Sequence, residues 1–421
     1  MTITKKNIII ILVSALLLIM SGLLFFHYDR IFKSNWEITD ELDGNIFPSI
    51  VLSMATSHTE IILPADSNFL GNPKSTFAIR IESPKENAHL RIELDESPYY
   101  NATVTDFDLP QKGKIYTVYP QMTWKYDNML IDQPKPLDVS IRVFINDKSF
   151  GSDTRTFSVR SINECLLGYK DKNKKYHDTG ILFAAYVNED HPMIDKILRE
   201  ALDTRIVRLF QGYQTSKPEN VKKQVYAIWY ALQQRNFKYS SISKTSLSSD
   251  MLFSQRVRTV GNSLESSQIN CLDGTVLFAS FLRAINIDPI IVRIPGHVFV
   301  GCYLDKKHTE KLFLETTFIG QIDLDDYMSD QYDEALVYEN DTTIKQIDTL
   351  NLRDFLLDTA YVALRKSTTK STISKATFDF AVKNATERYE KYKDFFGKNK
   401  PNYMYLEINN DIRKKIQPIG N

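Results

Sequence analysis

The hydrophobic pattern of this chain changes once along its length, and that change most restricts the folds it can adopt. From about Pro48 to Arg160, short runs of alternating apolar and polar residues are separated by turn-forming pieces such as "SPKEN" and "LPQKGK". From His191 onward, apolar residues recur at helical spacing instead. We therefore expect a β-rich part, followed by a part in which helices precede strands, which is typical of an α+β fold.

The β-rich part is predicted to be an immunoglobulin-like β-sandwich over residues 45–160. Regularly spaced short strands over about a hundred residues favour this architecture. The predicted strands cover residues 75–82, 88–95, 114–120, 137–146 and 155–160. We find no catalytic constellation among them, so we expect a spacer or a binding module there, and leave its protein partner open. With 421 residues, the chain is long enough for a second domain, predicted over 180–421 with its core at 190–330.

The N-terminal segment predicts where the protein resides. No charged residue occurs from Asn7 to Phe26, a length close to the ~20 apolar residues that cross a bilayer as a helix. A transmembrane anchor is therefore expected over residues 7–27, and a cleaved secretory signal is the alternative. Lys5 and Lys6 before the segment favour a cytoplasmic N-terminus. The sequence thus predicts a single-pass protein of the cell membrane, which contacts the membrane through this helix and has the bulk of its chain extracytoplasmic.

Charge and cysteine content narrow the classes of function. Lysine plus arginine and aspartate plus glutamate both number 52, so no net field attracts nucleic acid, and none is expected as a partner. The three cysteines, Cys165, Cys271 and Cys302, are too few for a disulfide scaffold. No CxxC, HExxH or Gly-rich phosphate loop occurs, and the acidic segment 323–334 lacks the glycine of a calcium loop. No metal and no cofactor are expected.

The stretch "NCLDGTVLFASFLRAI" is predicted to be a helix that begins at a cysteine. Asn270 is a favourable N-cap, and Asp273 three residues later can bond back toward the cap. Cys271 then lies in the first turn, where the positive end of the helix dipole favours the thiolate, the nucleophilic form. A buried packing role is the alternative for a lone cysteine.

A histidine and a carboxylate follow at positions that fit a catalytic triad. His297 is expected at the start of a strand, after the Pro295–Gly296 turn, and Glu315 on the next strand. A cysteine, a histidine base and an acid that orients the histidine form the arrangement of papain-like enzymes. The triad requires a register in which Phe299 faces Glu315, because only then do His297 and Glu315 lie on one face of the sheet. Cys302 is expected on the opposite face.

These motifs resemble the transglutaminase-like superfamily. The pieces that carry the resemblance are "NCLDGTVLFASFLRAINIDPIIV", "PGHVFVGCYL" and "LFLETT", with a weaker likeness from about Pro192 to the C-terminus. The resemblance implies a papain-like α+β fold with Cys271 as nucleophile, His297 as base and Glu315 as orienting acid. Two positions depart from the family pattern. Glu315 stands where aspartate is common, although its longer side chain still suits the Nδ1–H of the histidine, and Phe299 stands where tryptophan or tyrosine often follows the histidine.

The sequence therefore predicts an α+β protein with an N-terminal transmembrane helix, an immunoglobulin-like β-sandwich and a transglutaminase-like (papain-like) domain. The expected function is that of a thiol enzyme, a cysteine peptidase, amidase or acyltransferase that acts on extracytoplasmic peptides or proteins through a thioester. Hydrolysis with water and transamidation with an amine both stay open. Gln255 is a candidate oxyanion-hole donor beside the backbone N–H of Cys271. A catalytically silent binding or assembly module with the same fold is the alternative.

Overall fold

The structure, a computed structural model, describes residues 35–56, 67–320, 324, 370–398 and 402–420. It divides into two compact units, each assembled from separate stretches of the chain. Unit 1 consists of Met1–Asp40, Ile61–Thr123 and Asp138–Arg155, and unit 2 consists of Glu41–Glu60, Trp124–Leu137 and Thr156–Asn421. These units differ from the predicted domain boundaries, 45–160 and 180–421, because two stretches before residue 138 cluster with unit 2.

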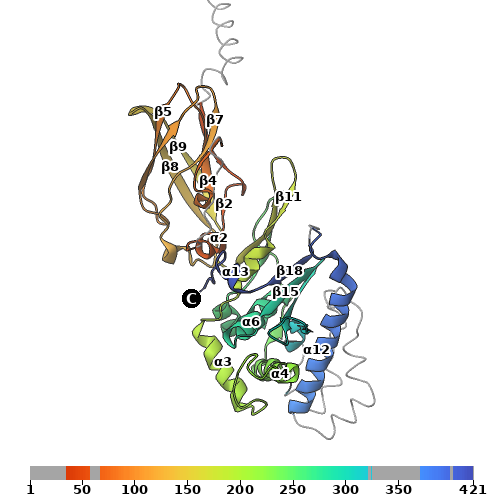
Figure 1. The fold of residues 1–421 in the computed structure, drawn as a ribbon. Helices are drawn as coiled ribbons and strands as arrows, with labels where there is room; N and C mark the ends of the chain where they lie inside the picture. Colours follow the sequence, from red (N-terminus) through yellow and green to blue (C-terminus); the bar gives the residue numbers. More distant parts are fainter. Residues whose placement is uncertain (1–34, 57–66, 321–323, 325–369, 399–401, 421) are drawn as a thin grey trace, which may run out of the picture. The chain divides into compact units, whose positions relative to one another are not determined.

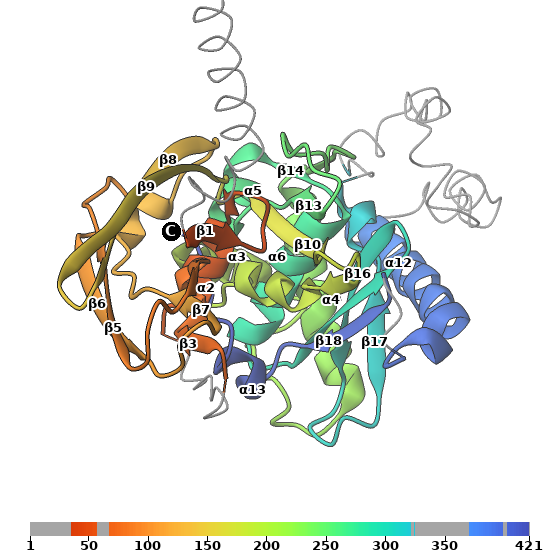
Figure 2. The same cartoon turned by 90° about the horizontal axis from the view of Figure 1, so that it is seen from above.

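Unit 1 is built from two β-sheets, which Figure 2 shows as separate layers. The first sheet has the order β1 (Trp36–Asp40), β4 (Phe77–Glu82), β7 (Ile115–Tyr119), β3 (Phe69–Gly71). The second has the order β2 (Asn45–Ile46), β9 (Lys148–Val159), β8 (Lys135–Ile145), β5 (Ala88–Leu94), β6 (Thr103–Leu109), of which β2 and the ends of β8 and β9 count with unit 2. Alternate residues such as Leu90, Ile92 and Leu94 are buried, in agreement with the period-two sequence pattern. The immunoglobulin-like assignment stays a prediction.

The predicted fold class needs one correction, which concerns the transmembrane helix. Among the described residues, no helix is both long and apolar enough to cross a membrane. The segment predicted to do so, residues 7–27, lies outside the described residues. The structure supports a mixed α+β fold with many strands, without a membrane-spanning helix in its described part. The expected localisation at the cell membrane depends on that segment alone and is not tested by the fold.

A four-stranded antiparallel sheet lies at the centre of unit 2 (Figure 1). Its strands, in order, are β17 (Lys311–Leu314), β16 (His297–Tyr303), β15 (Pro289–Ile294) and β18 (Met404–Glu407). The helices of this unit include α3 (Pro192–Asp203), α4 (Pro218–Gln234), α5 (Val260–Ser266), α6 (Cys271–Ala284) and α12 (Lys370–Tyr392). Val298 and Cys302 on one face of β16 share a core with α6, whereas Phe299 on the other face packs in a cluster with Tyr389 of α12. Burial on both faces explains why "HVFVGCY" is apolar nearly throughout.

The segment between the two predicted domains is folded within unit 2. Strand β10 (Glu164–Lys170) pairs with β11 (Tyr176–Asp178) and with β13 (Leu252–Arg256) in a three-stranded sheet. The charged run "KDKNKKYHD" is therefore the end of a hairpin and not a linker. The Asp171 carboxylate closes the turn, since it accepts hydrogen bonds from the N–H groups of Asn173 (2.8 Å) and Lys175 (3.0 Å).

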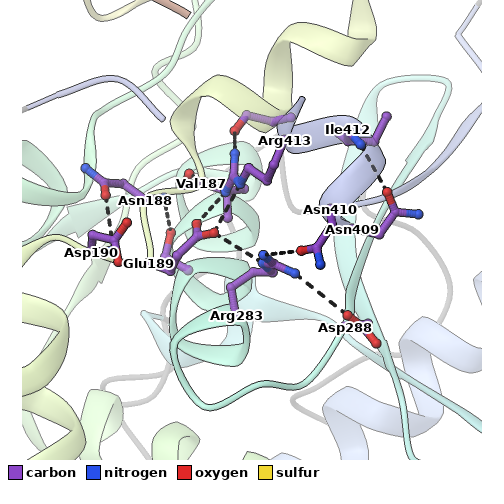
Figure 3. A network of polar contacts seen from close by, with 12 residues as sticks. Val187, Asn188, Glu189, Asp190, Arg283, Asp288, Asn409, Asn410, Ile412 and Arg413 are labelled. Carbon is purple, nitrogen blue, oxygen red and sulfur yellow. Dashed lines mark hydrogen bonds and ion pairs between the residues drawn. The ribbon is translucent and has the colours of Figure 1, made fainter. Parts of the chain in front are cut away.

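A cluster of charged side chains ties the C-terminal helix of unit 2 to the end of α6 (Figure 3). Glu189 Oε1 accepts from Arg283 Nε of α6 (3.2 Å) and from Arg413 Nε of α13 (Asn410–Arg413; 3.1 Å). Arg413 also donates to the carbonyl oxygens of Ala184 and Val187. Burial opposes the ionised form of Glu189, but the two arginines outweigh it and lower the pKa of this carboxyl group. The C-terminal end of α6 is thus fixed by charged contacts from three parts of the unit.

Candidate active site

Helix α6 begins at Cys271, as the sequence predicts. Asn270 Oδ1 accepts hydrogen bonds from the N–H groups of Leu272 (2.9 Å) and Asp273 (2.8 Å). The Asp273 carboxylate accepts in return from the N–H of Asn270 (3.0 Å), which completes a capping box. The backbone N–H of Cys271 is not part of this cap, and the cysteine is half-buried. The capping box therefore fixes the turn that carries the predicted nucleophile.

Asp273 also joins α6 to the segment before α5. Its Oδ2 lies 2.6 Å from Arg258 Nη1, and its Oδ1 accepts from the backbone N–H of Arg258 at 2.7 Å. Burial raises the pKa of Asp273, and the hydrogen bonds from Arg258 and Asn270 oppose that rise. A fully buried carboxylate with three donors is a satisfied network, which makes the first turn of α6 rigid.

The strand register is the one that the triad requires. Val300 lies opposite Leu314, so that Phe299 faces Glu315, the residue after β17. His297 and Glu315 consequently meet on one face, where His297 Nε2 is 2.5 Å from Glu315 Oε2. The register prediction is confirmed. The expected ring nitrogen was wrong: Glu315 binds Nε2, which leaves Nδ1 of the imidazole for a second partner.

Cys271 is a further partner of the His297 side chain. The Cys271 side chain is close enough to the imidazole to contribute to the raised pKa of His297. The Thr275 hydroxyl lies 2.7 Å from the carbonyl oxygen of Cys271 and 3.3 Å from that of Val298, the residue after the histidine. One side chain therefore links the first turn of α6 to the start of β16. The structure brings together Cys271, His297 and Glu315, although their catalytic role stays a prediction.

Glu315 is held by residues that the sequence analysis did not identify. Its Oε1 accepts from the N–H (3.3 Å) and the hydroxyl (2.9 Å) of Thr317. Arg388 of α12 places its Nε 3.9 Å from Oε2. A hydroxyl two residues after a carboxylate is a recurrent local pairing, so "LETT" carries a signal for Thr317. Nothing in the sequence near Glu315 points to Arg388, which comes from a distant helix.

The charges of this cluster favour an imidazolium beside the cysteine. Burial opposes the charged form of His297, but the Glu315 carboxylate and the Cys271 contact outweigh it and raise the pKa of His297 to about 10. Burial likewise opposes ionisation of Glu315, yet His297, Arg388 and Thr317 together lower the pKa of this carboxyl group. At neutral pH, the pair is therefore His297 imidazolium and Glu315 carboxylate.

The remaining predicted residues lie outside this cluster. Cys302 is buried on the opposite face of β16, as expected, and burial raises the pKa of its thiol to about 12. Cys165 on β10 is also buried, and burial raises the pKa of its thiol strongly. Gln255 is half-buried on β13, opposite Cys165. Its backbone neighbour Arg256 accepts a hydrogen bond from Asn270, but the oxyanion role of Gln255 itself stays a prediction.

No set of three histidine, cysteine or acidic side chains suited to a metal ion occurs among the described residues. The acidic segment 323–334, apart from Leu324, lies outside them. In comparisons with known proteins, no family model and no curated protein matches the sequence. The fold and the site together define a mixed α+β protein in which a cysteine at a helix start lies beside a histidine that is hydrogen-bonded to a buried glutamate.

Proposed function

We propose that the protein is a cysteine-dependent acyl-transfer enzyme of the transglutaminase-like type, which acts on carboxamide groups of peptides or proteins. The observation that carries the proposal is the series Cys271–His297–Glu315, with the cysteine at the first residue of a capped helix. A nucleophile, a base and an orienting acid are the three parts of covalent acyl transfer. The resemblance of the three sequence motifs to that superfamily supports the same conclusion.

The first half of the proposed reaction forms a thioester. The Cys271 thiolate attacks the carboxamide carbon, and the carbonyl electron pair moves to the oxygen. The backbone N–H of Cys271, which the helix cap leaves out, is a donor for that oxygen. The electron pair then returns, the C–N bond breaks, and His297 transfers its proton to the leaving nitrogen, which departs as an amine or as ammonia. Glu315 keeps the ring oriented throughout.

The second half of the reaction releases the acyl group. Neutral His297 takes a proton from the acceptor as it attacks the thioester carbon, and the C–S bond breaks to restore the thiolate. With water as acceptor, the product is a carboxylate and the enzyme is a peptidase or amidase. With a primary amine, the product is a new amide and the enzyme is a transamidase.

Alkylation of the full-length protein with iodoacetamide tests the proposal. At about pH 6, where an ordinary thiol with a pKa of ~8.5 reacts slowly, the proposed role of Cys271 as the nucleophile requires rapid modification of this cysteine. Peptide mass spectrometry identifies the modified cysteine. Cys165 and Cys302 serve as internal controls, because burial keeps both thiols protonated and enclosed. Slow modification of Cys271 at this pH would favour a catalytically silent binding module.

A second measurement separates the two acceptors. Incubation with a mixed library of peptides, with and without an added primary amine, is followed by mass spectrometry. Cleavage or loss of ammonia indicates hydrolysis, whereas peptides that carry the amine indicate transamidation. The Cys271→Ser variant is the matched control. Equal product formation by the variant would remove Cys271 from the mechanism.

A further inference from the structure

A cavity of about 640 Å³ within unit 2 adjoins the first turn of α6. Two contacts connect its wall to the capped turn. Asn270 Nδ2 donates to the carbonyl oxygen of Arg256 (3.3 Å), and Arg256 lines the cavity. Arg258, which also lines it, is the ion-pair partner of Asp273. The volume of the cavity falls in the range of ~300–1,000 Å³ that is usual for small-ligand sites.

The lining of the cavity is polar and carries fixed charges of both signs. Pro134 is the one apolar residue among those that line it. The buried guanidinium of Arg258 is held by Asp273 through Nη1, while its Nη2 has a long contact of 3.5 Å to Gln268. Asp132 is held in turn, because its carboxylate accepts from Asn163 Nδ2 at 2.9 Å. A cation and an anion are thus oriented before any ligand arrives.

Four charged side chains that line the cavity are available to bind a charged ligand. Within the part of the chain that the structure describes, Lys244, Arg256, Asp132 and Glu265 take part in no ion pair. Two of them are cations and two are anions, so the exposed charge of the lining sums to zero. A ligand that satisfies this wall has a carboxylate, an ammonium group and several hydrogen-bonding groups between them.

We propose that this cavity binds a short peptide with both termini free, its carboxylate at Arg256 and Arg258 and its ammonium group at Asp132. The proposal rests on the proposed function in one respect only, namely that the peptide bound here is a substrate of Cys271. Unblocked peptides are zwitterions with amide groups between their charges, which is the chemistry that the wall is built to meet. The cavity then selects short free peptides over internal segments of folded proteins.

Binding of triglycine to the full-length Cys271→Ala variant tests this proposal, because glycine residues contribute no side chains. We expect saturable binding in calorimetry, with a Kd of about 1 mM or tighter. N-acetyl-triglycine and triglycine amide each lack one terminal charge, and we expect about tenfold weaker binding for both, since one charge-assisted hydrogen bond is lost in each case. Equal affinities for the three peptides, or no saturation by triglycine up to about 10 mM, overturn the proposal.

Two substitutions assign the ends of the peptide. In Asp132→Asn, triglycine and N-acetyl-triglycine should bind equally. In Arg256→Gln, the preference for triglycine over triglycine amide should become smaller, because Arg258 is the carboxylate partner that remains. Asp153→Asn, on an exposed strand of unit 1, is the matched control and should keep the full preference. Unchanged preferences in both cavity variants place the peptide elsewhere. Alkylation of Cys271 in the unmodified protein is a separate readout, so peptide binding with an unreactive Cys271 keeps the cavity and rejects the enzyme.

Discussion

His297 is buried and nevertheless favours its charged form. The pKa of about 10 in the folded protein stands against an ordinary value of ~6.5 in an unfolded chain. A folded-state pKa that is raised in this way stabilises the fold fully below about pH 6.5, and the contribution is lost as the pH rises toward about 10. The imidazolium is present beside Cys271 below about pH 10.

Replacing Glu315 by glutamine tests this charge coupling. The variant keeps the shape of the side chain and removes the negative charge, so burial dominates and the pKa of His297 should fall from about 10 to near or below ~6.5. We also expect alkylation of Cys271 near neutral pH to slow by about tenfold to a hundredfold, because a charge-assisted hydrogen bond contributes ~1.5–3 kcal/mol. Titration of the histidine ring by NMR and the alkylation rate measure the two effects.

Glu310→Gln is the matched control for that experiment. Glu310 is an exposed glutamate just before β17, and its substitution should leave both readouts unchanged. An unaltered titration of His297 in the Glu315→Gln variant would show that the carboxylate does not hold the imidazolium, and it would reduce the triad to a dyad.

At the scale of elements, the approach of α6 to the acid strand depends on Gly274. A Cβ at this position would lie 2.7 Å from Thr316 Oγ1 and 3.1 Å from Thr316 Cβ, next to Glu315. Alanine favours a helix interior over glycine by ~1 kcal/mol. The clash opposes this gain, since Thr316 is fully buried and has little space to move.

We expect Gly274→Ala to destabilise the protein by about 1–3 kcal/mol despite the better helix propensity, and to slow alkylation of Cys271. Urea denaturation and the alkylation rate are the measurements. Adding Thr316→Ala removes the clashing hydroxyl and keeps the Cβ, so the double variant should recover part of the loss. A Gly274→Ala variant that is more stable than the parent would mean that α6 packs less closely against Thr316 than the structure indicates.

The sequence predicts elements well where one face is apolar and less well where contacts come from far along the chain. The sequence indicated β16 and β17 as strands but left two registers open. The structure shows the register that places His297 beside Glu315. Strand β6 escaped prediction because its half-buried face carries Thr103 and Thr105, which give little apolar alternation. Arg388 could not be assigned to the site, because only the packing of α12 brings it near Glu315.

At the scale of the whole molecule, the active-site unit depends on residues that precede much of unit 1 in the sequence. Phe47 is 1 % exposed and belongs to the same core as Tyr186 and Leu272 of unit 2. Two residues later, the Ser49 hydroxyl donates a hydrogen bond to the carbonyl oxygen of Glu164. Replacing the Phe47 ring by a smaller side chain should therefore destabilise the unit that contains Cys271.

We expect Phe47→Ala to lower the free energy of unfolding of unit 2 by ~3–5 kcal/mol, the usual loss for a buried aromatic side chain. Urea denaturation measures this free energy, with unfolding detected by the reaction of Cys165 and Cys302 with a thiol reagent. Phe69→Ala is the control, since Phe69 is 47 % exposed on β3 of unit 1, and the change expected there is within about 0.5 kcal/mol. Equal effects of the two substitutions would contradict the assignment of Phe47 to the core of unit 2.

The interleaving of the two units restricts how a gene for this protein can be rearranged. Along the chain, the stretches alternate between unit 1 and unit 2 up to Arg155, and only Thr156–Asn421 is a long uninterrupted piece. A single crossover between residues 41 and 155 leaves at least one unit without part of its own chain. Transfer of residues 156–421 alone leaves behind Phe47 and the stretch 124–137. Exchange of either unit with another gene therefore requires several coordinated breaks.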